Sequence, residues 1–76
     1  MINISRVNNI VFEGSHYHDD KKFDNYILWL DGYDEPLRMT KFKDITSKRD
    51  IPVVGNMISY DIDGDRLKSV KILYNT

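Results

Sequence analysis

Residues 55–73, GNMISYDIDGDRLKSVKIL, form the most regularly patterned part of the chain. Apolar and polar residues alternate on both sides of Asp63-Gly64, with the apolar positions at Ile58, Tyr60, Ile62, Val70, Ile72 and Tyr74. A period of two predicts strands that are buried on one face, and Asp63-Gly64 is expected to supply the positive-φ residues of a tight turn. Leu67 is out of step with the later apolar positions, which predicts a bulge. The stretch therefore predicts a β-hairpin.

Three extended segments precede this hairpin. In residues 2–14, INISRVNNIVFEG, the alternation holds at both ends and slips in the middle, which predicts a bulge or a sharp bend in a long strand. Residues 23–30, FDNYILWL, place one apolar set on each face: Tyr26, Leu28 and Leu30, against Phe23, Ile27 and Trp29. Residues 37–42, LRMTKF, put Leu37 and Met39 on one side and Arg38 and Thr40 on the other.

The segments between these strands carry turn and loop signals. Residues 15–22, SHYHDDKK, are expected to form a polar loop, and residues 31–36, DGYDEP, a turn. Residues 43–52, KDITSKRDIP, are the one part without alternation, so they predict a short helix or turn. Pro52 ends that segment because the residue before a proline disfavours helical backbone, and the fourth strand is expected to start near Val53.

Together these segments predict an all-β chain, with at most one short helix, in a single domain over residues 1–76. Five short antiparallel strands leave edges exposed unless their sheet closes on itself. A long, bent first strand allows closure because it can pair on both sides of a small barrel. The expected fold is a five-stranded antiparallel barrel with a short helix or loop between the third and fourth strands.

Composition and charge narrow the function classes. The formal net charge is −1, which opposes a strong general attraction to nucleic acid. The chain contains no cysteine, so disulfides, thiolate zinc sites and cysteine nucleophiles are excluded. There is no apolar run long enough to span a membrane and no signal-peptide pattern at the N-terminus. These features predict a cytoplasmic protein that does not associate with membranes.

The pattern of strands resembles the OB-fold, a small Greek-key barrel, while SH3-like and Sm-like barrels remain alternatives. The resemblance rests on the strand order, on the bent first strand, and on VVGNMISYDIDGDRLKSVKIL, where a glycine precedes the fourth strand. It implies a ligand face across the second and third strands, flanked by loops at residues 16–22 and 61–66. Carried onto this sequence, the implied face holds Trp29, Ile27, Arg38, Thr40, Lys41 and Lys43, with Tyr17, His18, Lys21 and Lys22 at its rim.

Catalytic and metal-binding patterns are weak. His16 and His18 lie at alternate positions, but only Asp19 and Asp20 are near enough in sequence to complete a metal site, so a solvated loop is the favoured interpretation. The DIDGD sequence at residues 61–65 lacks the ligand spacing of a calcium loop. The serines lie outside any nucleophile motif. We therefore expect a protein that is not an enzyme and needs no cofactor or metal.

Two binding functions follow from these residues. The first is binding of single-stranded DNA or RNA with weak to moderate affinity, in which an outward Trp29 beside Arg38 stacks on a base. The basic run from Arg38 to Arg49 supports it. The second is a protein-protein interaction module, such as an accessory or inhibitory protein that competes with nucleic acid on a larger machine, or a homodimer. Outward Ile27 and six acids within residues 19–35 support the second function. A Trp29 packed in a second small core would favour neither.

Overall fold

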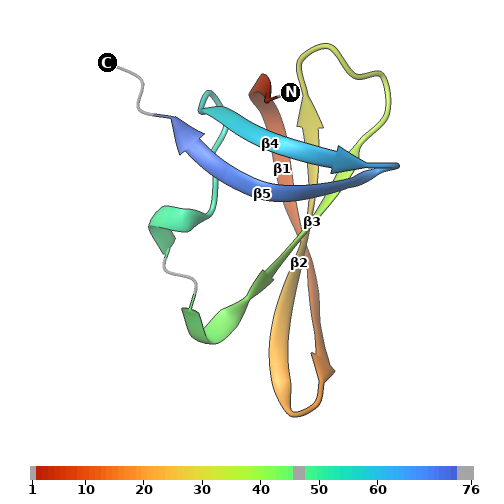
Figure 1. Ribbon diagram of the computed structural model, residues 1–76, viewed down its shortest axis with the longest axis vertical. Coiled ribbons are helices and arrows are strands. Elements are labelled where there is room, and N and C mark those ends of the chain that lie inside the picture. The colour runs from red at the N-terminus through yellow and green to blue at the C-terminus, as the bar shows by residue number, and fades with distance from the viewer. Residues whose placement is uncertain (1, 46–47, 74–76) are drawn as a thin grey trace.

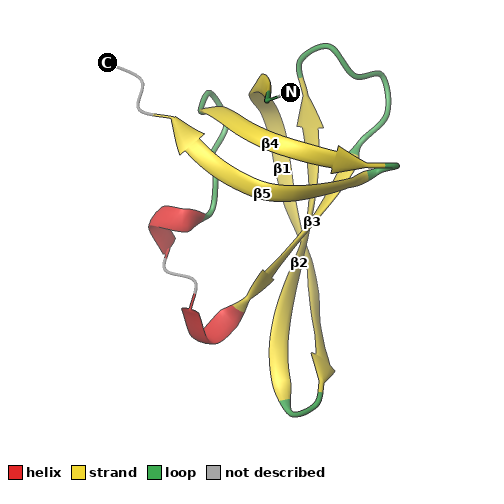
Figure 2. Cartoon of the chain, viewed as in Figure 1, coloured by secondary structure: helices red, strands yellow, loops and turns green. Residues whose placement is uncertain are grey.

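The computed structural model describes residues 2–45 and 48–73, except for the side chains of residues 45 and 48. Its elements follow the order strand, strand, strand, two 3-10 turns, strand, strand (Figures 1 and 2). Their bounds are β1 Asn3–His18, β2 Lys21–Leu30, β3 Leu37–Phe42, η1 Lys43–Ile45, η2 Lys48–Asp50, β4 Met57–Asp63 and β5 Arg66–Leu73. None of the described helical segments is long and apolar enough to cross a membrane. The all-β class is confirmed.

The strands form a closed barrel in the order β1-β2-β3-β5-β4, with β4 returning to β1. The long first strand closes it as predicted: residues 3–6 pair with β4, and residues 7–18 pair with β2. Two register shifts, between Val7 and Asn9 and between Phe12 and Ser15, bend this strand. The predicted antiparallel pairing holds at four of the five seams between described strands, and at the fifth Arg38 of β3 pairs in parallel with Arg66 of β5. Neighbours that are not joined by a hairpin are free to run in the same direction.

The prediction of a loop at residues 15–22 is wrong. β1 and β2 continue their pairing through this segment to the pair His18 and Lys21, so the hairpin projects well beyond the barrel (Figure 1). Asp19 and Asp20 form its turn, with φ angles of 51° and 64°. Two consecutive positive φ angles match the twist of a two-residue hairpin, and aspartate tolerates this backbone better than most residues do. The polar composition of residues 15–22 thus belongs to a hairpin that is polar on both faces, and not to a loop.

The β4–β5 hairpin has its turn one residue later than expected. Asp63 pairs with Arg66, which leaves Gly64 and Asp65 in the turn, and only Gly64 has positive φ, at 62°. Positive φ at the first central residue alone is the pattern of a type II′ turn. The predicted bulge in β5 is confirmed between Lys68 and Lys71. The predicted place of Tyr74 lies outside the described residues.

The described part of the connection from β3 to β4 contains two 3-10 turns, η1 and η2, in agreement with the predicted short helix or turn. β4 begins at Met57 and not near Val53, because residues 53–56 form a turn. In this turn the Val53 amide donates to Asn56 Oδ1, and the Asn56 amide donates to the Val53 carbonyl. Gly55 supplies the positive φ of 96° in that turn. Pro52, which precedes this turn in the sequence, is buried. The turn leads into β4 beside Val7, whose amide donates to the Asn56 carbonyl at 2.8 Å.

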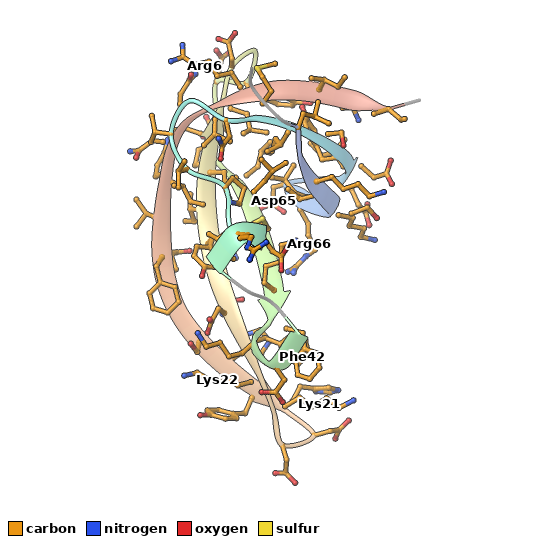
Figure 3. The ribbon with its side chains drawn as sticks, turned by 90° about the vertical axis from the view of Figure 1, so that its left-hand side faces the viewer. Arg6, Lys21, Lys22, Phe42, Asp65 and Arg66 are labelled. Carbon is orange, nitrogen blue, oxygen red and sulfur yellow. The ribbon has the colours of Figure 1, made fainter. Side chains whose placement is uncertain are left out.

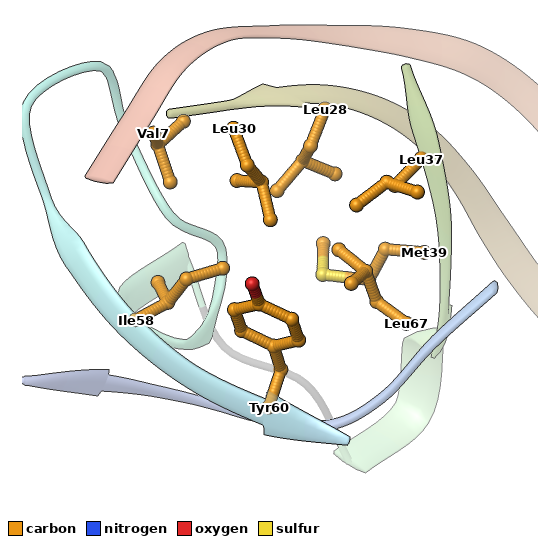
Figure 4. Packing of buried hydrophobic residues seen from close by; sticks show 8 residues of the cluster. All are labelled: Val7, Leu28, Leu30, Leu37, Met39, Ile58, Tyr60 and Leu67. Carbon is orange, nitrogen blue, oxygen red and sulfur yellow. The ribbon is translucent and has the colours of Figure 1, made fainter. Parts of the chain in front are cut away.

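The core fills the barrel interior (Figure 4). Every strand contributes to it, and its buried members are Val7, Leu28, Leu30, Leu37, Met39, Ile58, Tyr60 and Leu67. The predicted inward faces of the second, third and fourth strands are therefore confirmed, with Tyr26 half-buried against the cluster. Burial of these side chains away from water is the main stabilising contribution to the fold.

Tyr60 carries the one hydroxyl group of the core cluster. Its oxygen lies 2.7 Å from Ser5 Oγ and donates to the Tyr33 hydroxyl at 2.9 Å. Ser5 is itself buried. Burial raises the pKa of Tyr60 above its ordinary value of 10.0, and hydrogen bonding to Tyr33 adds to that rise.

We expect Tyr60→Phe to lower the free energy of unfolding by about 1–3 kcal/mol, since it leaves the buried Ser5 hydroxyl without this partner. The pH dependence should change too. The folded state holds the Tyr60 proton more tightly than the unfolded state, so this stabilisation is complete below pH 10.0 and is lost as pH rises through the raised pKa. Urea unfolding at pH 8 and above pH 10 would measure both effects. An equally steep alkaline loss in Tyr60→Phe would contradict this assignment.

Candidate functional site

The alternation of side chains along β2 separates two surfaces. Leu28 and Leu30 point into the barrel, so the odd-numbered residues point to the opposite side, which we call the outer face. Cross-strand partners share a face, and the register assigns these residues to the outer face of β1, β2 and β3: Asn9, Val11, His16, His18, Lys21, Phe23, Asn25, Ile27, Trp29, Arg38, Thr40 and Phe42. The outer face is therefore a continuous surface from the barrel to the hairpin tip.

A row of aromatic rings crosses the outer face near the hairpin tip. The rings of His16 and Phe23 are stacked, with centroids 5.4 Å apart and planes 14° apart. The ring centroids of Phe23 and Phe42 are 5.3 Å apart, and Lys21 Nζ lies 5.8 Å from the Phe42 ring centroid. Figure 3 shows Phe42 and Lys21 on the same side of the hairpin, and Lys22 on the other. One ring from each of three strands thus forms an aromatic row with a cation at its end.

A row of polar side chains runs beside the aromatic row, on the barrel side of it. Asn25 Nδ2 donates to His16 Nδ1 at 2.9 Å, and Asn25 Oδ1 accepts from Thr40 Oγ1 at 3.0 Å. Arg66 Nη1 of β5 donates to the same Thr40 oxygen at 3.4 Å. The polar row links four strands, and it fixes the His16 ring against Phe23.

The two rows border a groove of about 550 Å³. Its lining residues are Glu13, His16, His18, Phe23, Asn25, Tyr26, Arg38, Met39, Thr40 and Arg66. Arg38 Nε lies 3.5 Å from an Asp65 carboxylate oxygen, and both side chains are mostly exposed. An exposed pair of this kind contributes little to stability, so Arg38 can exchange Asp65 for another anion at low cost.

The structure brings part of the predicted site together. Six of its ten residues share the outer face: Trp29, Ile27, Arg38, Thr40, His18 and Lys21. Trp29 is half-buried and faces Asn9, six residues along β2 from Phe23. At 3.3 Å per residue, this separation is about 20 Å. Trp29 therefore lies at the far end of the face from the aromatic row.

The other four predicted residues lie elsewhere. Lys22 and Tyr17 pair with each other, and Lys41 pairs with Asp24, all on the side opposite the outer face. Lys43 lies in η1 with its Nζ 3.7 Å from Asp24. Asp24 is buried and also accepts from Ser15 Oγ at 2.6 Å. Lys43 and Ser15 thus compensate a buried carboxylate, which is a structural role.

Sequence reasoning did not include Phe23, Asn25 or Phe42 in the site. The alternation places Phe23 on the same face of its strand as Ile27 and Trp29, and this shared face is the feature of the sequence that points to Phe23. The contact between Phe23, His16 and Phe42 depends on pairing across three strands. Local sequence does not reveal that pairing, because the polar composition of residues 15–22 predicts a loop.

Metal-binding geometry is not present in the described ranges, where no three histidine, cysteine or acidic side chains gather. His18 Nε2 lies 3.3 Å from Asp19 Oδ2 at the exposed hairpin tip. His16, one step back on the same face, bonds to Asn25 instead. Near the groove, burial raises the pKa of Tyr26 above 10.0, with a smaller contribution from the nearby Asp24 charge. Tyr26 is therefore neutral at physiological pH.

Comparison with known proteins adds no relative to this description. No family model matches the chain, and neither curated proteins nor solved structures give a match. Function is therefore inferred from the residues of the outer face.

Proposed function

We propose that this chain is an OB-fold module that binds single-stranded nucleic acid on its outer face. The strand order β1-β2-β3-β5-β4, a first strand shared between two partners, and a parallel β3–β5 seam support the OB-fold assignment. The observation that carries the function is the aromatic row of His16, Phe23 and Phe42 beside Lys21.

The chemistry of the outer face suits an unpaired strand. Every base has an aromatic surface that can stack on exposed rings without regard to sequence. Lys21 lies at one end of the aromatic row, and Arg38 and Arg66 line the groove on the other side of it. Three cations on this face attract phosphates locally although the chain as a whole carries a net charge of −1. A duplex hides its base faces, so it should bind poorly.

Binding of fluorescein-labelled dT and rU oligonucleotides, measured by anisotropy, tests this function. We expect saturable binding of single strands, with little binding of the matching duplex. If the three cations neutralise phosphates, the slope of log K against log salt should be about −2, given roughly −0.7 per phosphate on single strands.

A matched pair of variants localises the interaction. Arg66→Gln removes a cation from the groove, while Lys71→Gln removes one near the other end of β5, opposite Ser59. We expect weaker binding and a shallower salt slope for Arg66→Gln alone. Equal binding of duplex and single strand, or equal losses in both variants, would contradict binding on the outer face.

A further inference from the structure

The barrel has a second groove, at the seam between β3 and β5. Pairing between these two strands is limited to Arg38 opposite Arg66, with the Arg38 amide donating to the Asp65 carbonyl at 2.7 Å. Beyond this pair the strands diverge (Figure 1). Within the described residues, the rest of β5 pairs with β4 only. One edge of β5 therefore lacks a neighbouring strand along most of its length.

A bulge lies at the centre of this edge. Asp61 pairs with Lys68 and Ser59 with Lys71, so Ser69 and Val70 together oppose the single residue Tyr60. Ser69 has a φ of 53°, an uncommon backbone conformation for a residue other than glycine. A bulge leaves its extra residue out of the ladder. The bulge thus adds unpaired backbone groups to an edge that is already open.

The groove at this edge measures about 260 Å³ and is basic. It is lined by Met39, Thr40 and Lys41 of β3 and by Arg66, Leu67, Lys68, Ser69 and Val70 of β5. Three of these residues are cations and none is acidic. Lys68 Nζ lies 3.2 Å from Asp63, but this ion pair is exposed and easily exchanged. Val70 is an apolar residue of the lining and is half-buried against the core.

We propose that this groove binds a short, extended, acidic segment of a partner protein, which adds to the edge of β5 as a strand. An added strand satisfies the main-chain groups of an open edge, and its alternate side chains supply specificity. Acidic side chains on one face of the segment would meet Lys41 and Lys68, and small apolar side chains on its other face would meet Val70.

The charge pattern disfavours a second copy of this chain as the occupant. In a centred antiparallel pairing of two β5 edges, Lys68 of one copy would face Lys71 of the other. Like charges directly opposite each other destabilise a strand pair, and lysine on an edge strand opposes self-association. An acidic strand turns the same lysines into favourable partners.

An NMR titration of the full chain with two synthetic octapeptides tests the proposal. The probe alternates glutamate and valine, and the control alternates lysine and valine. We expect saturable shifts of amides 68–72 with the glutamate peptide only, together with slower hydrogen exchange at those amides. A third peptide keeps the glutamate sequence but carries N-methyl groups on alternate amides. Since it cannot form the ladder, its Kd should be at least tenfold higher.

Two variants complete the design. Lys41→Gln should lower the affinity for the glutamate peptide severalfold. Lys22→Gln, on the projecting hairpin, should leave that affinity unchanged. The midpoint of thermal unfolding shows whether each variant is folded. Arg66 and Thr40 line both grooves, so substitution of either residue would not distinguish peptide binding from oligonucleotide binding. Failure of the glutamate peptide to bind, or equal binding of its N-methylated form, would overturn the proposal. So would protection of amides 68–72 by dT oligonucleotides or by concentration-dependent dimerisation. Oligonucleotide binding without peptide binding would refute this inference alone.

Discussion

Replacing Phe42 with alanine should weaken binding of single-stranded oligonucleotides by about 5- to 150-fold. This range corresponds to the roughly 1–3 kcal/mol that one base gains by stacking on an aromatic side chain. Phe42 contacts Phe23 and lies beneath Lys21, so its loss also disturbs the neighbouring ring and cation. Anisotropy of a labelled dT oligonucleotide, at one fixed salt concentration, measures the effect.

Phe12 provides the matched control for this substitution. It is 55% exposed and lies on the side opposite the outer face, where its ring centroid is 5.5 Å from that of Tyr26. Phe12→Ala therefore removes an exposed ring of the same type that belongs neither to the aromatic row nor to the lining of the groove, and binding should be unchanged. Thermal unfolding of both variants separates a loss of stacking from a loss of structure. If both substitutions reduce binding equally while both proteins remain folded, the outer face is not the nucleic-acid site.

Leu28→Ala should have the largest effect on stability. Leu28 is fully buried at the centre of the core, between Ile10 of β1 and Leu37 of β3. Removing a buried leucine costs about 2–5 kcal/mol, from lost burial and from the cavity left behind. Since domains gain roughly 0.05–0.15 kcal/mol of stability per residue, a chain of 76 residues has about 4–11 kcal/mol in total. The substitution should remove a large part of that, and urea titration would measure it.

Ile4 is the control for the core substitution. It lies on β1 opposite Ser59 but is 56% exposed, because neighbouring Ser5 takes the inward position. Ile4→Ala should change the free energy of unfolding by no more than about 0.5 kcal/mol, as is usual for surface positions. Similar losses for Leu28→Ala and Ile4→Ala would mean that the buried cluster is not the stabilising core.

The strand class and the inward faces were predictable from local pattern. Leu28, Leu30, Leu37, Met39, Ile58 and Tyr60 are buried as the alternation indicates. A period of two reports which face of a strand is apolar, whatever its partner is. The bulges in β1 and β5 were also visible, since an extra residue shifts the alternation.

The projecting hairpin could not be seen in the same way. Residues 15–18 and 21–22 are polar on both faces because this end of β1 and β2 has no core beneath it. Alternation of apolar and polar residues arises only when one face of a strand is buried. It therefore does not identify a strand whose two faces are both exposed to solvent. Backbone pairing across the Asp19–Asp20 turn maintains these strands, and main-chain hydrogen bonds leave little trace in side-chain pattern.

Local pattern was thus enough to predict an all-β chain, five strands, their apolar faces and the bent first strand, because these features depend on neighbours along one segment. The contacts between residues on different strands depend instead on the three-dimensional arrangement of the strands. It joined His16, Phe23 and Phe42 in one row, separated Trp29 from them, and moved Lys43 to the buried Asp24. It also set β3 parallel to β5 and left the edge of β5 open. Register and strand order arise from long-range pairing, in which a shift of one residue turns every side chain to the opposite face, so they cannot be read from one segment.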